Sequence, residues 1–534
     1  MIRIRDISLP AEHNPNQLNV EAARLLKVSV AKIRRLCIIR RSVDARKKPD
    51  VRFIYTVDVL VEGNEEKLLR RSGCKKAVLA PKEGYCVVKP QRIPRARPVV
   101  VGFGPAGMFA ALILAMAGWK PIVLERGDDA KTRHEKVQKF FRTGELDPHS
   151  NVQFGEGGAG TFSDGKLNTG VNNPRISWIL EQFVAHGARE DILYDAKPHV
   201  GTDVLLEVVQ NIRSHIIDLG GEVRFQTQVT GILTEQGCIS ALQLADGTVL
   251  PCEQVIFAIG HSARDTFEML EQNQIPMEPK PFAMGVRIEH LQSQIDQSQY
   301  GRERGDLPPA DYKLVRHLED ATVYTFCMCP GGYVVAAASE EGRVVTNGMS
   351  YVDRAGENAN AALLVTLNPE DFPGDDVLAG MRWQRQIEER AYHISGSYAA
   401  PAQRVEDFLL GRPSSGPGCV KPTYQPGVKW CDLHDVLPEK ITDSLAQALP
   451  QLDHNLKGFS SPDAVLTAPE TRSSSPVRIL RDKSRQSLVV KGLYPAGEGA
   501  GYAGGIMSAA IDGMLSAEAL LIQEEECHVR KADA

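Results

Sequence analysis

The chain has 534 residues, of which 43% are hydrophobic and 24% charged, so it is too long for one compact core and two or three globular domains are expected. The net charge of −5 is divided unevenly, with +11 on residues 1–92 and −16 on the remainder, which indicates a separate N-terminal module. No secretion signal is expected, because the N-terminus lacks an apolar signal core. No membrane insertion is expected either, because glycines and Pro105 interrupt the apolar stretch 99–119. The ten cysteines are scattered, so a cytoplasmic location with reduced thiols is expected.

Residues 1–92 are predicted to form a small basic α/β module, with strands at 2–9, 36–41 and 51–61 and a helix at 18–26. Residues 91–98 are rich in proline and arginine and are predicted to be a linker. Residues 32–48 carry eight basic side chains against one acid, Asp44. Such a surface either docks on the acidic remainder of the chain or binds RNA or another polyanion. We favour docking because the module lacks the clustered aromatic residues that stack on bases.

The next segment carries a dinucleotide-binding pattern. An apolar strand from residue 98 runs into Gly102-x-Gly104-x-x-Gly107 and then a helix at 106–117, which begins beside Pro105 and Ala106. Gly102 allows the tight turn, Gly104 lets the backbone approach a pyrophosphate, and Gly107 lets the helix pack on the strand. The helix N-terminus then faces the phosphates. After a second strand at 120–124, Glu125 is predicted to accept hydrogen bonds from ribose hydroxyls, beside Arg126.

Further along, helix 204–219 is followed by strands at 222–227 and 229–233 and a hairpin turn at 246–247. A buried strand at 255–259 ends at Gly260, and a C-terminal strand leads through Gly497, Glu498 and Gly499 into a helix that reaches residue 521. These segments resemble the FAD-dependent oxidoreductases that have a glutathione-reductase-type FAD domain. The resemblance places the acid Glu498 near the flavin ribitol and pyrophosphate, and the helix that starts near residue 506 at the flavin O2 side. It also implies contacts from the residues Val229, Ala258, Gly260, Gly497, Gly499, Gly505 and Ile506.

Four longer motifs resemble the bacterial family labelled uncharacterised "NAD(FAD)-utilising dehydrogenases", which is related to flavoproteins that reduce carbon–carbon double bonds. They are FGEGGAGTFSDGK at 154–166, PFAMGVRIE at 281–289, CMCPGG at 327–332 and ETRSSSPVR at 470–478. Resemblance of the first motif to fumarate-reductase-like flavoproteins implies that it contacts the flavin through Gly157, Gly158, Thr161 and Ser163. The cofactor implied is non-covalent FAD. Because no second strand–glycine–helix unit is present, NAD(P)H is expected only as a transient electron donor.

Three residues are candidates for catalysis. Arg287 and Arg472 are predicted either to anchor an anionic substrate and polarise it, or to form ion pairs of the fold. His261 is either a general acid within reach of the flavin or a structural histidine. Cys327-x-Cys329 is interpreted as two buried thiols, with a redox pair and half of a metal site as alternatives; no complete set of metal ligands is found nearby, so no metal site is predicted.

The predicted fold class is α/β. It comprises a Rossmann-like FAD domain in two segments, 93–280 and 465–525, an inserted α+β substrate domain at 281–464, the N-terminal module at 1–92 and a tail at 526–534. The predicted function is FAD-dependent oxidation or reduction, with hydride or electrons passing through flavin N5 to or from an unidentified small-molecule or macromolecular substrate. An RNA-binding or RNA-modifying flavoprotein and a non-catalytic redox sensor are the alternatives.

Overall fold

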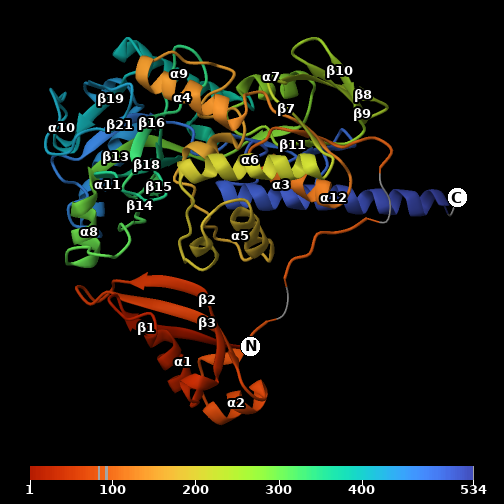
Figure 1. The fold of residues 1–534 in the computed structure, drawn as a ribbon. Coiled ribbons are helices and arrows are strands. Elements are labelled where there is room, and N and C mark those ends of the chain that lie inside the picture. The colour runs from red at the N-terminus through yellow and green to blue at the C-terminus, as the bar shows by residue number, and fades with distance from the viewer. Residues whose placement is uncertain (82–83, 91–93, 533–534) are drawn as a thin grey trace.

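The structure is a computed structural model that describes residues 1–81, 84–90 and 94–532. It has an N-terminal module set apart from a larger body, in which a parallel sheet and a large mixed sheet lie side by side (Figure 1). The predicted α/β architecture, with a Rossmann-like domain in two segments and an inserted α+β part, is confirmed. Residues 91–93 of the predicted linker lie outside the described residues. In the part of the chain that is described, no helix has both the length and the apolarity to cross a membrane.

The N-terminal module is a sheet with strand order β2-β3-β1-β4, packed against α1. Alternate apolar residues of β1, such as Ile2 and Ile4, are fully buried, as expected for a strand with one face on a core. The predicted strands and helix of this module are confirmed. Its elements are β1 (Ile2–Pro10), α1 (Gln17–Leu26), β2 (Ile33–Asp44), β3 (Arg52–Val61), α2 (Glu65–Ser72) and β4 (Ala77–Leu79).

Contacts between the module and the larger body include those of strand β2 and of the turn between β2 and β3. The backbone of Arg41 pairs with Tyr194 and Ala196, through hydrogen bonds of 2.7 and 2.8 Å. The Arg41 guanidinium forms an ion pair with Asp195 at 2.7 Å. Lys48 donates from Nζ to the carbonyl of Ser298 at 2.5 Å. Two of the eight basic residues at 32–48 are therefore used in contacts with the rest of the chain.

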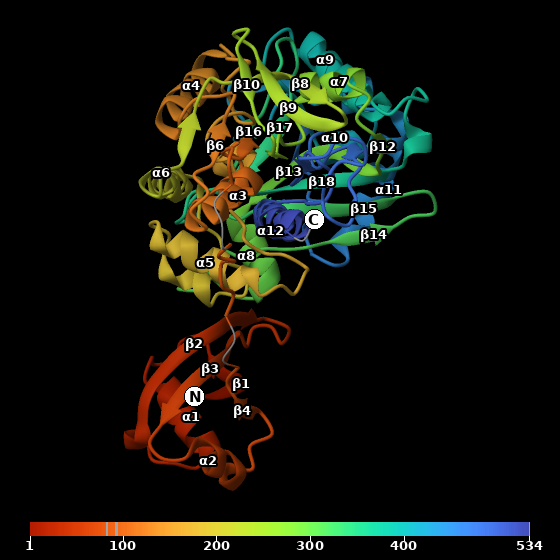
Figure 2. The ribbon, with the colours of Figure 1, turned by 90° about the vertical axis from the view of Figure 1, so that its right-hand side faces the viewer.

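The Rossmann-like domain has a parallel sheet with strand order β23-β11-β5-β6-β7. Val100 of β5 packs on the layer formed by α3, α6 and α12, whereas Val99 and Val101 face the β8–β9 layer, because strand side chains alternate between faces. Helices α3 and α12 run side by side in both views (Figures 1 and 2). The elements of this domain are β5 (Val99–Val101), α3 (Pro105–Met116), β6 (Ile122–Leu124), α4 (Ala130–Thr143), η2 (Gly158–Phe162), α5 (Arg175–Ala185), α6 (Thr202–Asp218), β7 (Glu222–Arg224), β8 (Val229–Glu235), β9 (Cys238–Leu244), β10 (Val249–Pro251), β11 (Val255–Phe257), α7 (Arg264–Gln272), β23 (Leu493–Pro495) and α12 (Ile506–Ala532).

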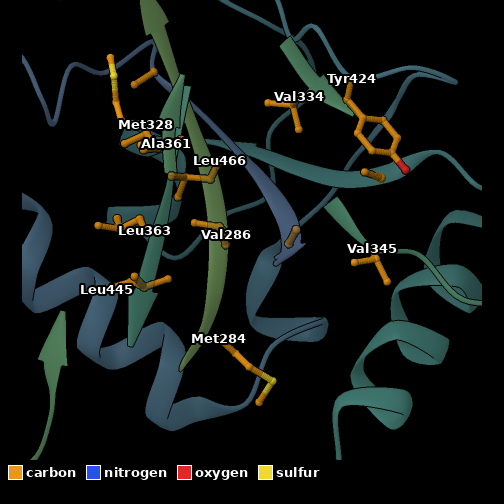
Figure 3. Close-up of a cluster of buried hydrophobic side chains, with 14 of the residues drawn as sticks. Met284, Val286, Met328, Val334, Val345, Ala361, Leu363, Tyr424, Leu445 and Leu466 are labelled. Carbon is orange, nitrogen blue, oxygen red and sulfur yellow. The ribbon is translucent and has the colours of Figure 1, made fainter. Parts of the chain in front are cut away.

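The inserted part is built on a sheet with strand order β14-β15-β18-β13-β21-β19-β20. Its apolar face packs on α11, where Leu445 lies beside Leu363 of β18, and Val286 of β13 and Leu466 of β21 belong to the same apolar cluster (Figure 3). The elements are β13 (Phe282–Leu291), α8 (Gln292–Tyr300), β14 (Val315–His317), β15 (Thr322–Cys329), β16 (Tyr333–Ala336), β17 (Thr346–Met349), β18 (Asn358–Leu367), α9 (Ala379–Ser395), β19 (Ala400–Arg404), α10 (Val405–Leu409), β20 (Val428–Trp430), α11 (Glu439–Asp453) and β21 (Val465–Glu470), with β12 (Met277–Pro279) and β22 (Val477–Ile479) pairing at the junction.

Two predicted boundaries differ from the structure. Strand β21 pairs with β13 and β19, so the inserted sheet continues past residue 464 to Glu470. The pairing of β21 with strands distant in sequence is decided by tertiary structure, and no local sequence pattern marks the end of the inserted sheet. Helix α12 continues to Ala532, so the residues predicted as a tail from 526 onward are helical as far as 532.

Candidate functional site

A cavity of about 740 Å³ lies between the Rossmann-like domain and the inserted sheet. Its walls include the glycine turn before α3, the loop at 153–163, the ends of β11 and β15, and the turn before α12. This volume is typical of sites that bind cofactors and other small molecules. Of the predicted cofactor contacts, Gly102, Gly104, Pro105, Ala106, Glu125, Arg126, Gly158, Ser163, Val229, Ala258, Gly260, Glu498, Gly505 and Ile506 line the cavity.

The three glycines of the fingerprint have different surroundings. Gly102 has φ +91°, and a Cβ there would meet the Ala258 carbonyl oxygen at 2.3 Å. A Cβ on Gly107 would lie 1.9 Å from the carbonyl oxygen of Gly102, so only glycine lets α3 pack this closely. Gly104 has an ordinary φ of −75°, and its Cβ would lie in ordinary contact with Gly158 Cα, at 3.6 Å. Gly104 lines the cavity and could carry a Cβ, whereas Gly102 and Gly107 are required by packing.

The first turn of α3 opens into the cavity without a side-chain cap. Helix geometry leaves its leading backbone N–H groups without intrahelical partners, and these groups and the helix dipole favour an anion. The Glu125 carboxylate accepts from the backbone N–H groups of Phe103, Gly127 and Gly155 at 2.8, 2.9 and 3.0 Å. A carboxylate has about four acceptor positions. Glu125 therefore organises the turns around the cavity and has capacity for one further donor, such as a ribose hydroxyl.

The loop at 153–163 contributes in two ways. Gly158 has φ +61° and faces Gly104, and with Ser163 it lines the cavity. Gly157 and Thr161 do not line it: a Cβ on Gly157 would meet Thr161 Oγ1 at 2.1 Å, and that hydroxyl donates to the Glu156 carbonyl at 3.3 Å. The contacts expected from Gly157 and Thr161 are therefore absent from the lining, and both residues shape the loop instead. A sequence pattern does not separate lining from loop-shaping glycines, because both need the same backbone freedom.

The other end of the cavity is formed by the start of α12. Ile506 is the first residue of this helix, Gly505 precedes it, and Glu498 lines the same part of the cavity. Burial raises the pKa of Glu498 to about 7, partly offset by the Gly505 N–H at 3.4 Å. Gly497 and Gly499 do not line the cavity but pack behind it, where a Cβ would lie 2.7 Å from Ala106 Cβ and 2.4 Å from the Gly260 carbonyl oxygen, respectively. Glu498 is thus an acid that keeps a proton up to near-neutral pH.

His261 lines the cavity, with 11% of its side chain exposed. Its Nδ1 lies 3.0 Å from the Ser262 hydroxyl, which donates to Gln153 Oε1 at 3.0 Å. That hydroxyl therefore accepts from Nδ1–H, and Nε2 is an acceptor 3.9 Å from Glu498 Oε1. Burial, with the nearby positive charge of Arg472, lowers the pKa of His261 to about 3. The imidazole is neutral at physiological pH, so the proton-donating role predicted for His261 fits Glu498 better.

The two candidate arginines differ. Arg287 is fully buried and outside the cavity lining, and its five N–H donors are directed to Glu470 (two contacts), Asn347, Asn360 and the Cys327 carbonyl. It holds the wall and has no donor left for a substrate, contrary to the catalytic prediction, because β21 places Glu470 against it.

Arg472 lines the cavity, and among the described residues four of its five N–H donors are paired, with Glu388, Glu340 and Ser339. Its pairing with Glu388 at 2.8 Å is part of a buried cluster that also includes Arg264. Of the two candidate arginines, Arg472 is the one that lines the cavity.

Among the lining residues that were not predicted as site residues, two have chemically reactive side chains. Lys166, at the end of the 154–166 motif, lines the cavity with 24% of its side chain exposed. Cys327 lines it as well, whereas Cys329 is fully buried, so the interpretation as two buried thiols fits only Cys329. Within the described residues no cluster of three or more histidine, cysteine or acidic side chains could hold a metal. The sequence indicated Cys327 only through its place in the motif at 327–332. The exposure of Cys327 to the cavity depends on a bulge in β15.

Two family models match parts of the chain. Residues 281–473 match the family model described as "FAD-dependent protein, C-terminal domain-like", and residues 1–60 match a domain of unknown function. Among solved structures, glycine oxidase from Bacillus cereus ATCC 14579 is 12% identical with a TM-score of 0.32, covering 80% of this chain and 96% of that one. Halogenase PltM is 10% identical with a TM-score of 0.38, covering 82% and 70%. At these scores, nothing of their activities is carried over.

A protein of Clostridium beijerinckii (strain ATCC 51743 / NCIMB 8052), described as an uncharacterized protein, is 47% identical over 532 residues. The match covers 97% of this chain and 98% of the relative. The chain therefore belongs to the same family as this protein.

Proposed function

We propose that the protein is an oxidoreductase that binds one FAD non-covalently in the cavity and transfers hydride or electrons to or from an unidentified substrate. When bound, the flavin supplies two-electron chemistry at N5. The observation that supports this proposal best is the cavity itself, into which the N-termini of α3 and α12 both open. The proposal includes the more specific assignment to the NAD(FAD)-utilising dehydrogenases.

The residues present fit the cofactor. The N–H groups of the first turn of α3 would hold the pyrophosphate in the cavity, beside Gly104 and Gly158, which line it without side chains. Glu125 would accept from a ribose hydroxyl with its remaining capacity. At the far end, the positive end of the α12 dipole would stabilise negative charge on the flavin. Glu498 would hold or release a proton there near neutral pH, and Arg472 would bind an anionic group of the substrate.

The proposed electron donor is NAD(P)H. The described residues contain one parallel sheet with a glycine fingerprint, which is the proposed FAD site. NAD(P)H would therefore bind transiently at the open side of the cavity, without a domain of its own. The test is anaerobic reduction of the purified yellow protein by NADH, NADPH and dithionite, followed by reoxidation with candidate acceptors. Full FAD loading with no turnover by any donor would instead favour the redox-sensor alternative.

An RNA-binding role is a second candidate, supported by one observation. Lys32, Arg35 and Arg40 are exposed on the N-terminal module, while Arg41 and Lys48 contact the larger body. The exposed residues would contact phosphates, with an affinity that falls steeply with salt. Titration of a labelled structured RNA into the full protein and into its K32E/R35E/R40E variant tests this. If both proteins bind the RNA equally or neither binds it, the role left for the basic side chains is docking of the module on the larger body.

A further inference from the structure

The pair Cys327 and Cys329 lies where β15 departs from regular strand geometry. Phe326 pairs with Ala362 of β18, but Cys329 pairs with Asn360, so β15 contains an extra residue, a bulge. In a regular strand two residues advance the chain by about 6.5 Å. That separation is larger than the Cβ–Cβ distance of about 3.8 Å that a disulfide needs. Here Cys327 has φ +40°, and the Cys329 thiol turns back to within 3.3 Å of the Cys327 carbonyl oxygen.

The conformation at Cys327 is held from two sides. Arg287 donates from Nη1 to the Cys327 carbonyl at 2.9 Å, and the Cys329 thiol donates to the same oxygen at 3.3 Å. A left-handed conformation is unfavourable for a residue with a Cβ, and such strain collects at functional sites. Met328, between the two cysteines, is 4% exposed and belongs to the apolar cluster (Figure 3). The bulge thus directs Cys327 to the cavity while its neighbours remain in the core.

The charges around the pair make the two thiols unequal. The neighbouring Cys329 thiol and the positive charges of Arg287 and Lys166 hold the pKa of Cys327 well below its ordinary value, against burial and the negative charge of Asp164. The pKa of Cys329 is raised by its bond to Cys327 and by burial. Two further carboxyl groups, Glu470 and Glu498, are close enough for the charge of Cys327 to raise their pKa values. One thiolate facing a cavity beside one protonated thiol is the arrangement of a reactive dithiol.

We propose that Cys327 and Cys329 form a dithiol–disulfide couple that exchanges an electron pair with the flavin, an inference that rests on the proposed FAD site. In the oxidising direction the Cys327 thiolate and the Cys329 thiol lose two electrons. The S–H bond of Cys329 breaks and an Sγ–Sγ bond forms. Oxidised FAD takes up the two electrons and the proton released by Cys329, so that thiolate, thiol and FAD give a disulfide and singly protonated reduced FAD. The reverse reaction reduces the disulfide.

The geometry favours a reversible couple over an inert pair. A disulfide between residues this close in sequence is strained, and strained disulfides are the more readily reduced, catalytic kind. Two structural thiols would need neither a left-handed residue nor a place in the cavity wall. The dithiol lets the protein store a second electron pair in addition to the pair held by the reduced flavin.

The first test counts electrons. In an anaerobic dithionite titration, the oxidised FAD-loaded protein should take up four electrons per FAD, and the Cys329→Ser and Cys327→Ser variants should take up two. The matched control is Cys238→Ser, because Cys238 is an exposed free cysteine on β9 outside the cavity lining, and it should retain four. Uptake of two electrons by the unmodified protein with full FAD would overturn the dithiol proposal and leave the flavin function standing. A protein that never binds FAD would overturn the proposed function instead.

The second test needs no variant and no turnover. Trypsin releases residues 317–343 as one peptide that contains Cys327 and Cys329 and no other cysteine. After air oxidation, this peptide should be lighter by two hydrogens and should take up no iodoacetamide until it is reduced, whereas after dithionite treatment of the loaded protein it should take up two equivalents. Two alkylated cysteines in the oxidised sample would overturn the proposal even if both serine variants fail to fold.

Discussion

The substitution Gly104→Val separates cofactor binding from folding. The backbone of Gly104 has an ordinary φ of −75°, and a Cβ there meets no protein atom closer than Gly158 Cα at 3.6 Å. The variant should therefore fold. The valine methyl groups would, however, occupy the space in front of the first turn of α3, where the pyrophosphate is proposed to bind.

The magnitude follows from the hydrogen bonds that would be lost. Displacement of a phosphate from two N–H groups of the α3 N-terminus removes two charge-assisted hydrogen bonds, each worth about 1.5–3 kcal/mol. The loss of about 3–6 kcal/mol weakens FAD binding by about two to four orders of magnitude. The FAD-free variant should unfold at the same denaturant concentration as the FAD-free parent.

The assay is flavin content after purification, combined with titration of FAD into the FAD-free protein, followed by fluorescence. Gly416→Val is the matched control, because a Cβ at Gly416 meets nothing within 4 Å and the residue is outside the cavity. Gly107→Ala provides the contrast: its Cβ would clash with the Gly102 carbonyl oxygen at 1.9 Å, so folding itself should suffer. A Gly104→Val protein that binds FAD as tightly as the parent would refute the placement of the pyrophosphate.

Three further predictions concern the cavity and its wall. Removal of Arg287 by Arg287→Ala should lower the free energy of unfolding by about 3–5 kcal/mol, because it leaves Glu470 buried and unpaired, and urea denaturation measures this. Arg472→Ala should keep FAD bound but slow reoxidation of the flavin by an anionic acceptor in stopped-flow experiments; an unchanged rate would make Arg472 purely an ion-pair residue. Because the folded pKa of Glu498 is about 7 against an ordinary 4.5, the native state binds the extra proton, and the stability of the FAD-free protein should fall by up to about 3 kcal/mol as pH rises from about 4.5 through 7. The Glu498→Gln variant should lose this part of the slope in urea unfolding curves recorded from pH 5 to 8, and a slope equal to that of the parent would show that other groups cause it.

Local sequence determined the Rossmann-like unit. The Gly102, Gly104 and Gly107 spacing, an apolar strand on each side and the terminal Glu125 are all short-range features, because the turn, the helix and the close packing each depend on residues within one βαβ unit. The helix at 204–219 was likewise predictable, since its buried residues recur with the helical period. The sequence also indicated the separate basic module through its charge alone.

Tertiary structure decided which residues of the predicted site reach the cavity. Arg287 and Glu470 are 183 positions apart, and only the pairing of β13 with β21 brings them together and removes Arg287 from the cavity. Cys327 reaches the cavity because β15 bulges against β18, a change that alters which side each residue faces. Strand register and bulges depend on contacts between segments distant in sequence, so the local pattern of residues predicts the strands but not the faces that these side chains occupy.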